Sequence, residues 1–424
     1  MRFRSAAIAA LIVCSCVVER AIADERLSLD DAFARVLEFH PDLKLFDFNR
    51  AVVATDLERA ALTPPLTLTL DAENLLGSGA AAGVRGAELT VSLASAIERA
   101  GKRDARLAVA SRRLDALAQT ERARRLDVLA EVARRYLDVV AAGAAERIAE
   151  DDIAQRQRTV GAASRRVQAG ASPASVQLAA ESQLARAQLE RHRVQREKIT
   201  AYRRLAMLWG ERDARKLADV ANALATPHVI AFDEVAALLE ASPELKRFAG
   251  ESRLREARVQ LALSARQADI GWRLGVRRLQ ADSDWGLVGS VSMPLGAATR
   301  AGPDIRAAEA ELAALDLERE SSELGLYSTL AQAHGRLAAS VADANEIRDS
   351  VLPLLQQAEA AAERAYRAGA LSYLEWAQLQ SETTALRRQR LVAIVDAQRT
   401  IIEIQRLTGA SFATAPQQER RSSR

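Results

Sequence analysis

Hydrophobic and polar residues alternate in four short segments of the chain. One pair of segments covers residues 66–73 and 87–93, and a second pair covers residues 270–277 and 285–293. A period of two is typical of a β-strand that has one apolar and one polar face. Each pair is separated by a stretch rich in Gly, Asn, Asp or Ser. The pattern therefore predicts two β-hairpins in a chain that is otherwise helical.

Very long helices occupy most of the remaining sequence. Residues 100–169 keep a helical pattern that is roughly 105 Å long if the helix is continuous. The matching pattern covers residues 303–368. Pro353 lies inside it and should kink the helix, because proline lacks a backbone N–H and its ring clashes with the preceding turn. Shorter helices are predicted for residues 29–39, after the capping-box-like Ser28, and for residues 41–62.

Four glycines mark an internal repeat. Gly369 follows Gly170 by 199 positions, and Gly409 follows Gly210 by the same interval. The first glycine of each half ends a long helix, and the second ends the returning helix, so each half should hold a helical hairpin with a tight tip. Ser172-Pro173 predicts an N-cap and first helical residue at one tip, and Ser372 and Glu375 predict a capping box at the other.

The first 23 residues are typical of a secretory signal. An apolar stretch over residues 6–18 is too short to span a bilayer, and Ala21-Ile22-Ala23 fits a cleavage site. Lipid attachment at Cys16 is the alternative. Both cysteines of the chain, Cys14 and Cys16, fall in this segment, so no disulfide framework and no thiolate metal site are expected. The predicted organisation is a signal peptide (1–23), a first repeat (24–210), a linker (211–231), a second repeat (232–409) and a disordered tail (410–424).

Composition and charge favour long solvated helices. Ala, Leu, Arg and Glu dominate, and aromatic residues make up only 4% of the chain. The formal net charge is +3, and Arg and Glu are interleaved along the helices, as in i, i+4 pairing. This distribution gives no indication of a nucleic-acid partner.

The four strands present a physical problem that one chain does not solve. Each has the length of a membrane-spanning strand, four strands cannot close a barrel, and an open sheet edge is not tolerated in lipid. Three chains would supply twelve strands and close a barrel around a water-filled lumen. The alternative is a soluble sheet that packs on the helices of its own chain. In the barrel, Trp272 and Trp285 suit an aromatic belt at the membrane interface. The polar residues expected to line the lumen are Thr67, Thr69, Asp71, Glu88, Thr90, Arg273, Arg277, Ser290 and Ser292.

At this point the chain resembles the TolC-type outer-membrane efflux proteins. The segment from Tyr366 to Glu375 (YRAGALSYLE) carries the most specific similarity, together with the repeat and the order of strands and hairpins. Residues 73–79, 86–93 and 96–103 resemble the cobalt–zinc–cadmium efflux branch of this family. The resemblance implies a mainly α fold with a small transmembrane β part. It implies a homotrimer in the lipid of the cell outer membrane, with a 12-stranded barrel continuous with a periplasmic tunnel. It also implies a periplasmic adaptor and a proton-driven inner-membrane pump of the resistance–nodulation–division class.

Two roles follow from the resemblance. An acidic ring at the periplasmic aperture would contain Glu375, which is also the predicted capping-box residue. Gln378 stands where the family has a second acid, and Val176 stands at the equivalent of Glu375 in the first half. The residues expected to dock the adaptor lie at the two hairpin tips: Gly170, Ala171, Ser172, Gly369, Ala370, Leu371 and Ser372.

The chain carries no constellation typical of an enzyme. Its four histidines are widely separated and form no metal-binding pair, and there is no phosphate-binding loop. Three methionines are too few for a thioether pathway. No cofactor is expected. The sequence therefore predicts a passive duct for divalent heavy-metal cations. A channel for organic drugs, a periplasmic adaptor and a coiled-coil scaffold are the alternatives.

Overall fold

The computed structural model describes residues 27–75, 77–79, 83–213, 220 and 224–412. The predicted signal peptide, with its cleavage and lipidation alternatives, lies outside the described residues, as do residues 413–424 of the predicted tail. Phe412 is buried, and its ring centroid is 6.1 Å from that of Phe33. The prediction that the tail begins at residue 410 is therefore wrong, because the chain is still packed on the body at Phe412.

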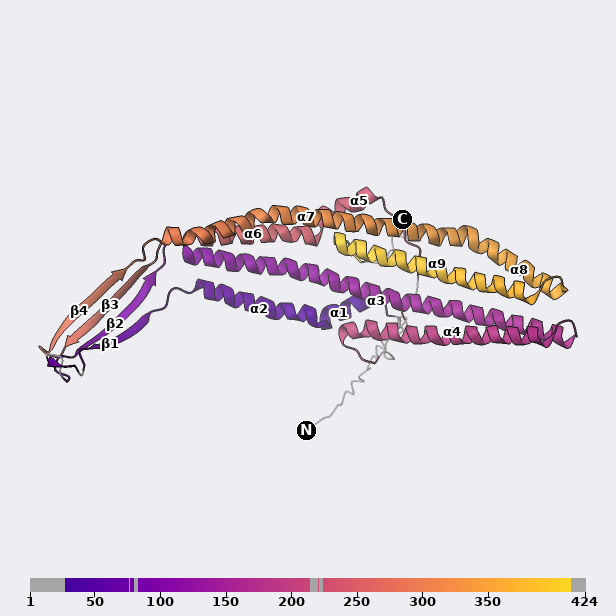
Figure 1. Ribbon diagram of the computed structural model, residues 1–424, viewed down its shortest axis with the longest axis horizontal. Helices are drawn as coiled ribbons and strands as arrows, with labels where there is room; N and C mark the ends of the chain where they lie inside the picture. The colour runs from indigo at the N-terminus through magenta and orange to yellow at the C-terminus, as the bar shows by residue number, and fades with distance from the viewer. Residues whose placement is uncertain (1–26, 76, 80–82, 214–219, 221–223, 413–424) are drawn as a thin grey trace, which may run out of the picture.

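The described part of the chain is long and thin, with a β-sheet at one end and two helical hairpin tips at the other (Figure 1). None of its helices is long and apolar enough to cross a membrane. Its elements are α1 (Leu29–Phe39), α2 (Pro41–Ala61), β1 (Thr67–Glu73), β2 (Glu88–Ile97), α3 (Lys102–Gln168), α4 (Ala174–Ala206), η2 (Met207–Trp209), α5 (Phe232–Ala237), η4 (Leu238–Ala241), α6 (Pro243–Ser264), β3 (Ile270–Leu279), β4 (Asp284–Ser292), α7 (Ala297–Glu346), η5 (Ile347–Val351), α8 (Leu352–Ala368) and α9 (Tyr373–Thr408). Of these, η2 and η4 are 3₁₀ helices and η5 is a π-helix.

The four strands form one antiparallel sheet in the order β1-β2-β3-β4. The two predicted hairpins are therefore joined edge to edge through β2 and β3, although these strands lie far apart in the sequence. The second predicted hairpin has its turn around Ser283, whose φ of 57° is in the left-handed region. The element order of the first half, two helices, two strands and a helical hairpin, recurs in the second half.

The long helix of the second half is interrupted and that of the first half is not. Helix α3 runs through 67 residues, which is roughly 100 Å. In the second half, the five residues of η5 separate α7 from α8 just before Pro353. Proline cannot donate to the carbonyl of Asp349, one turn back, and a π-helical turn accommodates the break. The predicted kink at Pro353 is thus confirmed.

The four repeated glycines have one conformation. Gly170, Gly210, Gly369 and Gly409 all have φ between 69° and 85°, a region that favours glycine. At both tips the N–H after the glycine bonds to the carbonyl five residues back, Ala171 to Arg166 and Ala370 to Ala365. The glycine N–H bonds to the carbonyl three residues back. This double pattern is the Schellman motif, so both helices end by the same device.

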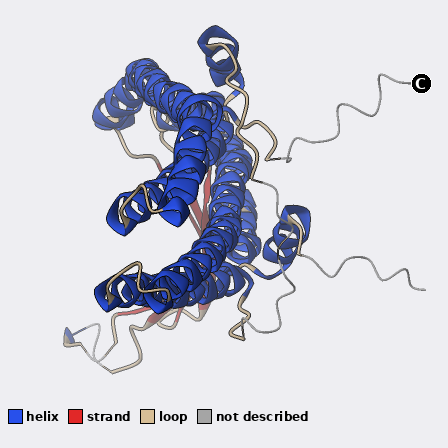
Figure 2. Ribbon diagram, turned by 90° about the vertical axis from the view of Figure 1, so that its right-hand side faces the viewer, coloured by secondary structure: helices blue, strands red, loops and turns tan. Residues whose placement is uncertain are grey.

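The hydrophobic core is divided into small clusters along the helices. One cluster joins α6, α7 and α9 and includes Leu330, and two clusters surround the middle of α3 near α1. A fourth lies at the hairpin tips. Viewed from the tips, the helices form a curved wall that is open on one side (Figure 2). This arrangement suits a segment of a tube wall better than a self-contained globule.

Candidate channel wall and hairpin tips

The sheet has one polar and one apolar face, as the alternation predicts. The β-register sets Thr69 opposite Ser92, and Asp71, Thr90 and Arg277 in one row across the strands. Because directly opposed residues share a face, all nine predicted lumen residues lie on the same side of the sheet. Their role in lining a lumen remains a prediction, but their shared face is a property of the sheet.

Charged residues on the polar face are paired across the strands. Arg277 donates to the Thr90 hydroxyl at 2.9 Å and to the Glu88 carboxylate at 2.7 Å. Glu73 lies 3.3 Å from the same guanidinium, and Arg273 lies 3.7 Å from Asp71. The polar face therefore carries both signs of charge in close pairs.

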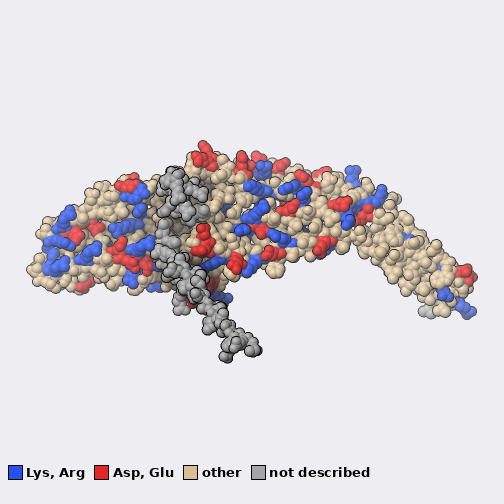
Figure 3. Space-filling model, turned by 180° about the vertical axis from the view of Figure 1, so that it is seen from behind, with Lys and Arg blue, Asp and Glu red and all other residues tan. Residues whose placement is uncertain are grey.

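The apolar face of the sheet is bare. Leu70, Val91 and Leu287 lie in one row across it, and Leu287 is 84% exposed. No helix of the described chain covers the sheet (Figure 1). On the face that Figure 3 shows, the charged side chains of this end gather mainly at the loop tip, whereas the helical body carries both signs of charge along its length. The alternative of a soluble sheet packed on its own helices is therefore wrong.

Trp272 and Trp285 both lie on the apolar face, at opposite ends of the strands. Trp272 lies opposite Val291 and Ser95, near the helical body. Trp285 lies opposite Arg278 at the loop end, and the Arg278 guanidinium lies 5.6 Å from the centroid of its ring. The sequence reasoning missed Arg278, which falls in phase with the apolar positions. A cation beside an exposed tryptophan is suited to a lipid headgroup region.

Arg166 joins the two hairpin tips. Its guanidinium donates to the Tyr366 carbonyl at 2.8 Å, to the Ser172 hydroxyl at 3.2 Å and to the Ala171 carbonyl at 3.2 Å. It also lies 5.2 Å from the centroid of the Tyr366 ring. The predicted N-cap at Ser172 is wrong, since Pro173 is the N-cap and no side chain caps α4. The Ser172 hydroxyl accepts from Arg166 instead.

A small aromatic core lies directly behind the tips. Tyr366 and Trp376 are each 2% exposed, with ring centroids 5.1 Å apart, and Tyr373 packs beside them. Ala162 and Ala163 of α3 belong to the same cluster, so the core contains residues of both hairpins. The two tips of one chain are thus held together by apolar burial as well as by Arg166.

Glu375 is the capping-box residue of α9, as predicted. Its carboxylate accepts from the Ser372 hydroxyl at 2.7 Å and from the Ser372 N–H at 3.0 Å. These two bonds hold the pKa of the Glu375 carboxyl below its usual range. The residue remains exposed, so capping does not remove it from the surface.

Glu375 and Gln378 lie along one groove of about 630 Å³ between α8 and α9. Glu382 lies in the same groove and accepts from the Gln378 amide at 2.9 Å. The sequence reasoning compared only the position three residues after Glu375 and missed Glu382. The spacing of 375, 378 and 382, at 3 and 4 residues, identifies one helix face and could have found it.

A buried polar cluster links α3 to α9 behind the tip core. Asp152 accepts from Arg156 at 3.0 Å and from the Thr384 hydroxyl at 3.1 Å, and all three residues are buried. Thr159 and Gln380 are also buried and are 2.9 Å apart. No local pattern predicts this contact, because its partners are more than 200 positions apart in the chain.

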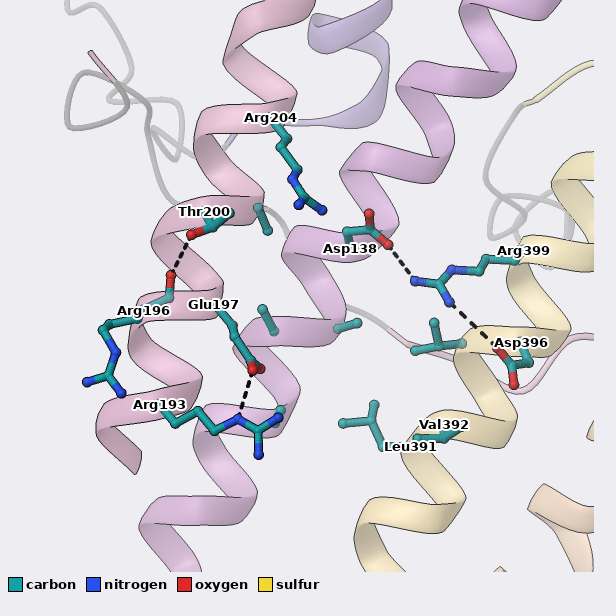
Figure 4. Close-up of a pocket in the computed structure, with 15 residues that line it drawn as sticks. Asp138, Arg193, Arg196, Glu197, Thr200, Arg204, Leu391, Val392, Asp396 and Arg399 are labelled. Carbon is teal, nitrogen blue, oxygen red and sulfur yellow. Dashed lines mark hydrogen bonds and ion pairs between the residues drawn. The ribbon is translucent and has the colours of Figure 1, made fainter. Parts of the chain in front are cut away.

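A second cavity, of about 650 Å³, lies between α3, α4 and α9 (Figure 4). Ion pairs lie along it, Arg399 with Asp138 at 2.7 Å and Arg193 with Glu197 at 3.1 Å, and the arginines Arg196 and Arg204 also line it. Within the described residues, no group of three or more His, Cys, Asp or Glu side chains could hold a metal ion. Among the described residues, this cavity therefore offers charged side chains, some of them paired, and no chelating site.

Comparison with known proteins agrees with this geometry. The family model described as outer membrane efflux protein matches residues 37–211. The cobalt-zinc-cadmium resistance protein CzcC of Cupriavidus metallidurans is 27% identical over 308 residues, which cover 72% of this chain and 69% of that protein. The predicted resemblance to the outer membrane efflux proteins is confirmed.

Solved structures of channel and outer-membrane proteins share the fold. CusC has a TM-score of 0.74 at 17% identity, covering 90% of this chain and 92% of its own. VceC from Vibrio cholerae has a TM-score of 0.72 at 16% identity, covering 91% and 97%. The channel OprN has a TM-score of 0.70 at 18% identity, covering 90% of each chain. The shared fold and the match to the outer membrane efflux protein model together support an outer-membrane location.

Proposed function

We propose that this chain is one subunit of an outer-membrane exit channel for divalent heavy-metal cations. The observation that carries the proposal is the sheet, with one polar face, one bare apolar face and two unpaired edges at β1 and β4. An open sheet edge is not stable in lipid, so copies of the chain must close it. Three copies supply twelve strands, and the polar faces then surround a water-filled pore.

The helical part extends this pore on the periplasmic side. The curved wall of one chain (Figure 2) would become a closed tube with three copies side by side. Its far end carries the two tips, which form a single block held by Arg166 and the aromatic core. We assign the docking of a periplasmic adaptor to this block, with an inner-membrane resistance–nodulation–division pump supplying the energy. The chain itself would be a passive duct without catalysis.

The cargo assignment rests on the similarity to CzcC, a cobalt-zinc-cadmium resistance protein. Charged side chains without a chelating group suit a duct, because cargo must leave as readily as it enters. Glu375 and Glu382 would place acidic side chains of each subunit at the periplasmic aperture. Such a ring attracts cations without the ligand set that would retain them.

Two variants of β4 test the channel. Leu287 and Ser290 are both exposed and point to opposite faces of the sheet. Leu287→Arg places a charge on the lipid side, at a cost of about 2–4 kcal/mol near the bilayer centre, whereas Ser290→Arg places it in the lumen. We expect Leu287→Arg to lose outer-membrane trimers and Ser290→Arg to retain them with altered conductance. Equal insertion of both variants, or a wild-type detergent-extracted mass near that of one chain, would refute the barrel.

A deletion strain tests the cargo. We expect deletion to lower tolerance to zinc, cadmium and cobalt, and expression of wild type or Ser290→Arg to restore it at least in part, while Leu287→Arg restores nothing. Unchanged metal tolerance combined with new sensitivity to organic drugs would instead support the organic-efflux alternative.

A further inference from the structure

Arg278 is the one charged side chain among the strand residues on the apolar face of the described sheet. It lies opposite Leu89 of β2 and Trp285 of β4, two rows of pleat from Leu274, and the register sets all of them on one face. The other strand residues of this face are uncharged. An arginine on a lipid-facing surface is strongly unfavourable at the bilayer midplane and nearly neutral at its edge. The position of Arg278 therefore requires explanation.

The described chain offers the Arg278 guanidinium no carboxylate. The side chain is exposed and forms no ion pair with a described residue. Its contact is with the Trp285 ring, whose centroid lies 5.6 Å from the guanidinium carbon. Asp284 precedes that tryptophan but is opposed to Leu279, so it belongs to the polar face. The N–H donors of the guanidinium are therefore open to whatever surrounds the sheet.

A second arginine bounds the apolar face at its other end. Arg99 follows Ile97, the last residue of β2, by two positions, and Met293 follows Val291 of β4 by two positions. Both residues thus continue the phase of the apolar side chains. The Arg99 nitrogen Nη1 lies 3.8 Å from the Met293 sulfur. The Arg99 side chain is exposed and, like Arg278, has no ion pair with a described residue.

The separation of the two arginines matches the apolar layer of a membrane. Leu89, which lies beside Arg278, and Arg99 are ten positions apart in the chain. Ten strand residues are roughly 34 Å long, and about 26 Å across a bilayer at a strand tilt of about 40°. The lipid-facing apolar band of a membrane barrel is about 25 Å tall. In the proposed channel, each arginine therefore lies at the level of lipid headgroups.

We propose that Arg278 and Trp285 bind the phosphate group of a phosphorylated glycolipid in the outer leaflet of the outer membrane. The inference rests on the proposed function, because it requires the apolar face to be turned toward lipid. The guanidinium donates two parallel hydrogen bonds to the phosphate oxygens, and the Trp285 ring covers one face of the guanidinium.

The loop end of the sheet is the end that would face the outer leaflet. The helical body joins the sheet at the opposite end (Figure 1), and in the proposed channel this body lies in the periplasm. Trp285 and Arg278 lie in the row next to the turn around Ser283. The pair is therefore on the far side of the bilayer from periplasmic partners.

A lipid fits the surface around Arg278 better than a free anion does. Leu89 in the same row is 44% exposed, and Leu287 in the next row is 84% exposed. One molecule with an anionic headgroup and acyl chains covers these leucines and binds the guanidinium. Free phosphate would bind the guanidinium and leave the leucines bare, which costs the free energy of hydrating apolar surface.

Lipid binding to the purified full chain tests the site. Native mass spectrometry in a neutral detergent measures the mass of the assembly and the number of lipids that it holds. The probe is diphosphoryl lipid A, and the matched probe is the same acylated glycolipid after enzymatic removal of its phosphates. Inorganic phosphate is added as a competitor in a third arm.

Three variants separate recognition of phosphate from other effects. We expect Arg278→Gln to bind diphosphoryl lipid A on the order of tenfold more weakly than wild type, because it loses charge-assisted hydrogen bonds. Arg278→Lys should bind with intermediate affinity, since an ammonium keeps the charge but lacks the planar fork. Arg273→Gln is the matched control. It removes the same charge from the polar face of the same strand, so it should bind the lipid as wild type does.

The dephosphorylated glycolipid should bind wild type and Arg278→Gln equally and more weakly than diphosphoryl lipid A binds wild type. The measured mass shows whether each variant assembles as wild type does. If Arg278→Gln does not assemble, the comparison of wild type with Arg278→Lys decides, and equal lipid affinity of these two proteins would contradict phosphate binding by the fork.

Four results would overturn the site. They are unchanged lipid binding in Arg278→Gln, equal weakening in Arg273→Gln, equal binding of the two glycolipids by wild type, and displacement of the lipid by millimolar inorganic phosphate. The last result would assign Arg278 to a free anion. Each of the four, obtained with an intact trimer, leaves the proposed channel standing. A monomeric wild-type protein would instead overturn the proposed function itself.

Discussion

The guanidinium of Arg166 donates a hydrogen bond of 2.8 Å to the backbone carbonyl of Tyr366, although 200 positions separate the two residues. Arg166 belongs to the first hairpin and Tyr366 to the second. The same guanidinium binds the Ser172 hydroxyl and the Ala171 carbonyl of its own tip. One side chain therefore fixes the position of one tip relative to the other.

Arg166→Ala should loosen this junction. Hydrogen bonds from a charged donor stabilise by about 1.5–3 kcal/mol, and here the carbonyl of Tyr366 would lose that donor. We expect faster hydrogen–deuterium exchange in the peptides that contain residues 165–172 and 365–373, with little change near the sheet. Arg165→Ala is the matched control, because the Arg165 side chain is exposed and has no hydrogen bond or ion pair with a described residue. Equal exchange in the two variants would contradict the role given to Arg166.

Gly275 should be required where β2 and β3 meet. A Cβ atom at this position would lie 2.6 Å from the Val91 carbonyl oxygen and 2.6 Å from the Ser92 Cβ. Overpacking of this kind costs typically about 1–3 kcal/mol, and a backbone carbonyl in a paired strand has little room to move. Gly275→Ala should therefore lower the yield of folded trimers in the outer membrane, measured as the band that resists SDS at room temperature.

Gly286 provides the control for Gly275. It lies on the same polar face, and a Cβ atom there would meet nothing within 4 Å. Gly286→Ala should leave the yield of folded trimers unchanged. If both alanine variants assemble as well as wild type, the close approach at Gly275 does not constrain the sheet.

The sequence predicted the features that depend on local periodicity. The period of two assigns Thr90 and Arg277 to the polar face whichever strand lies beside them, and the sheet confirms that face. The equal spacing of the tip glycines likewise predicted two equivalent helix ends, because a left-handed residue after a long helix is a local requirement. The capping box at Ser372 and Glu375 could be predicted for the same reason, because its two residues are three positions apart.

Contacts between distant segments could not be predicted in this way. Nothing near Arg166 indicates Tyr366, and nothing near Asp152 indicates Thr384. The failed N-cap at Ser172 has the same origin. Its local sequence suits a cap, but the hydroxyl is engaged by Arg166. The local preference of a serine for an N-cap position is not realised where a charged side chain offers its hydroxyl a competing hydrogen bond.

The charge of Glu375 should persist in mildly acidic solution. The Ser372 hydroxyl, and next the Ser372 N–H, lower the pKa of the Glu375 carboxyl from 4.5. In planar bilayers, the cation preference that Glu375 contributes should therefore hold as pH falls to 4.5 and disappear only below it. Ser372→Ala removes the hydroxyl but keeps the backbone N–H, so the preference should be lost at a higher pH. Glu375→Gln should lower the cation preference at neutral pH. The pH dependence that Glu375 gives to this preference should be lost in the variant.

These variants distinguish a role of Glu375 in cation selectivity at the aperture from its role as a helix-capping residue. Gln378→Glu adds a carboxylate in the same groove without altering the cap, so it should raise the cation preference. If Glu375→Gln and Gln378→Glu both leave the reversal potential unchanged, Glu375 acts only as a capping residue.

Acid should weaken the junction between α3 and α9 through Glu403, whose carboxylate lies 3.5 Å from the Arg134 guanidinium of α3. Arg406 binds Glu403 at 2.6 Å and Asp127 at 3.2 Å, and the Glu403–Arg406 hydrogen bond lowers the pKa of the Glu403 carboxyl from 4.5. A carboxyl whose pKa is lower in the folded state stabilises that state above its unfolded pKa. The stabilisation is lost as pH falls through the folded value. Glu403 should therefore contribute fully at pH 7 and lose its contribution below pH 4.5.

Thermal unfolding followed by circular dichroism between pH 7 and pH 3 measures this contribution. Glu403→Gln should have a lower midpoint than wild type at pH 7, and the difference should shrink as the solution becomes acidic, because both proteins then carry an uncharged side chain there. Glu320→Gln is the control, since Glu320 is exposed on α7 and pairs with no described residue, and its midpoint should follow that of wild type at every pH. A constant difference between Glu403→Gln and wild type down to pH 3 would show that Glu403 stabilises the junction by packing and not by its charge.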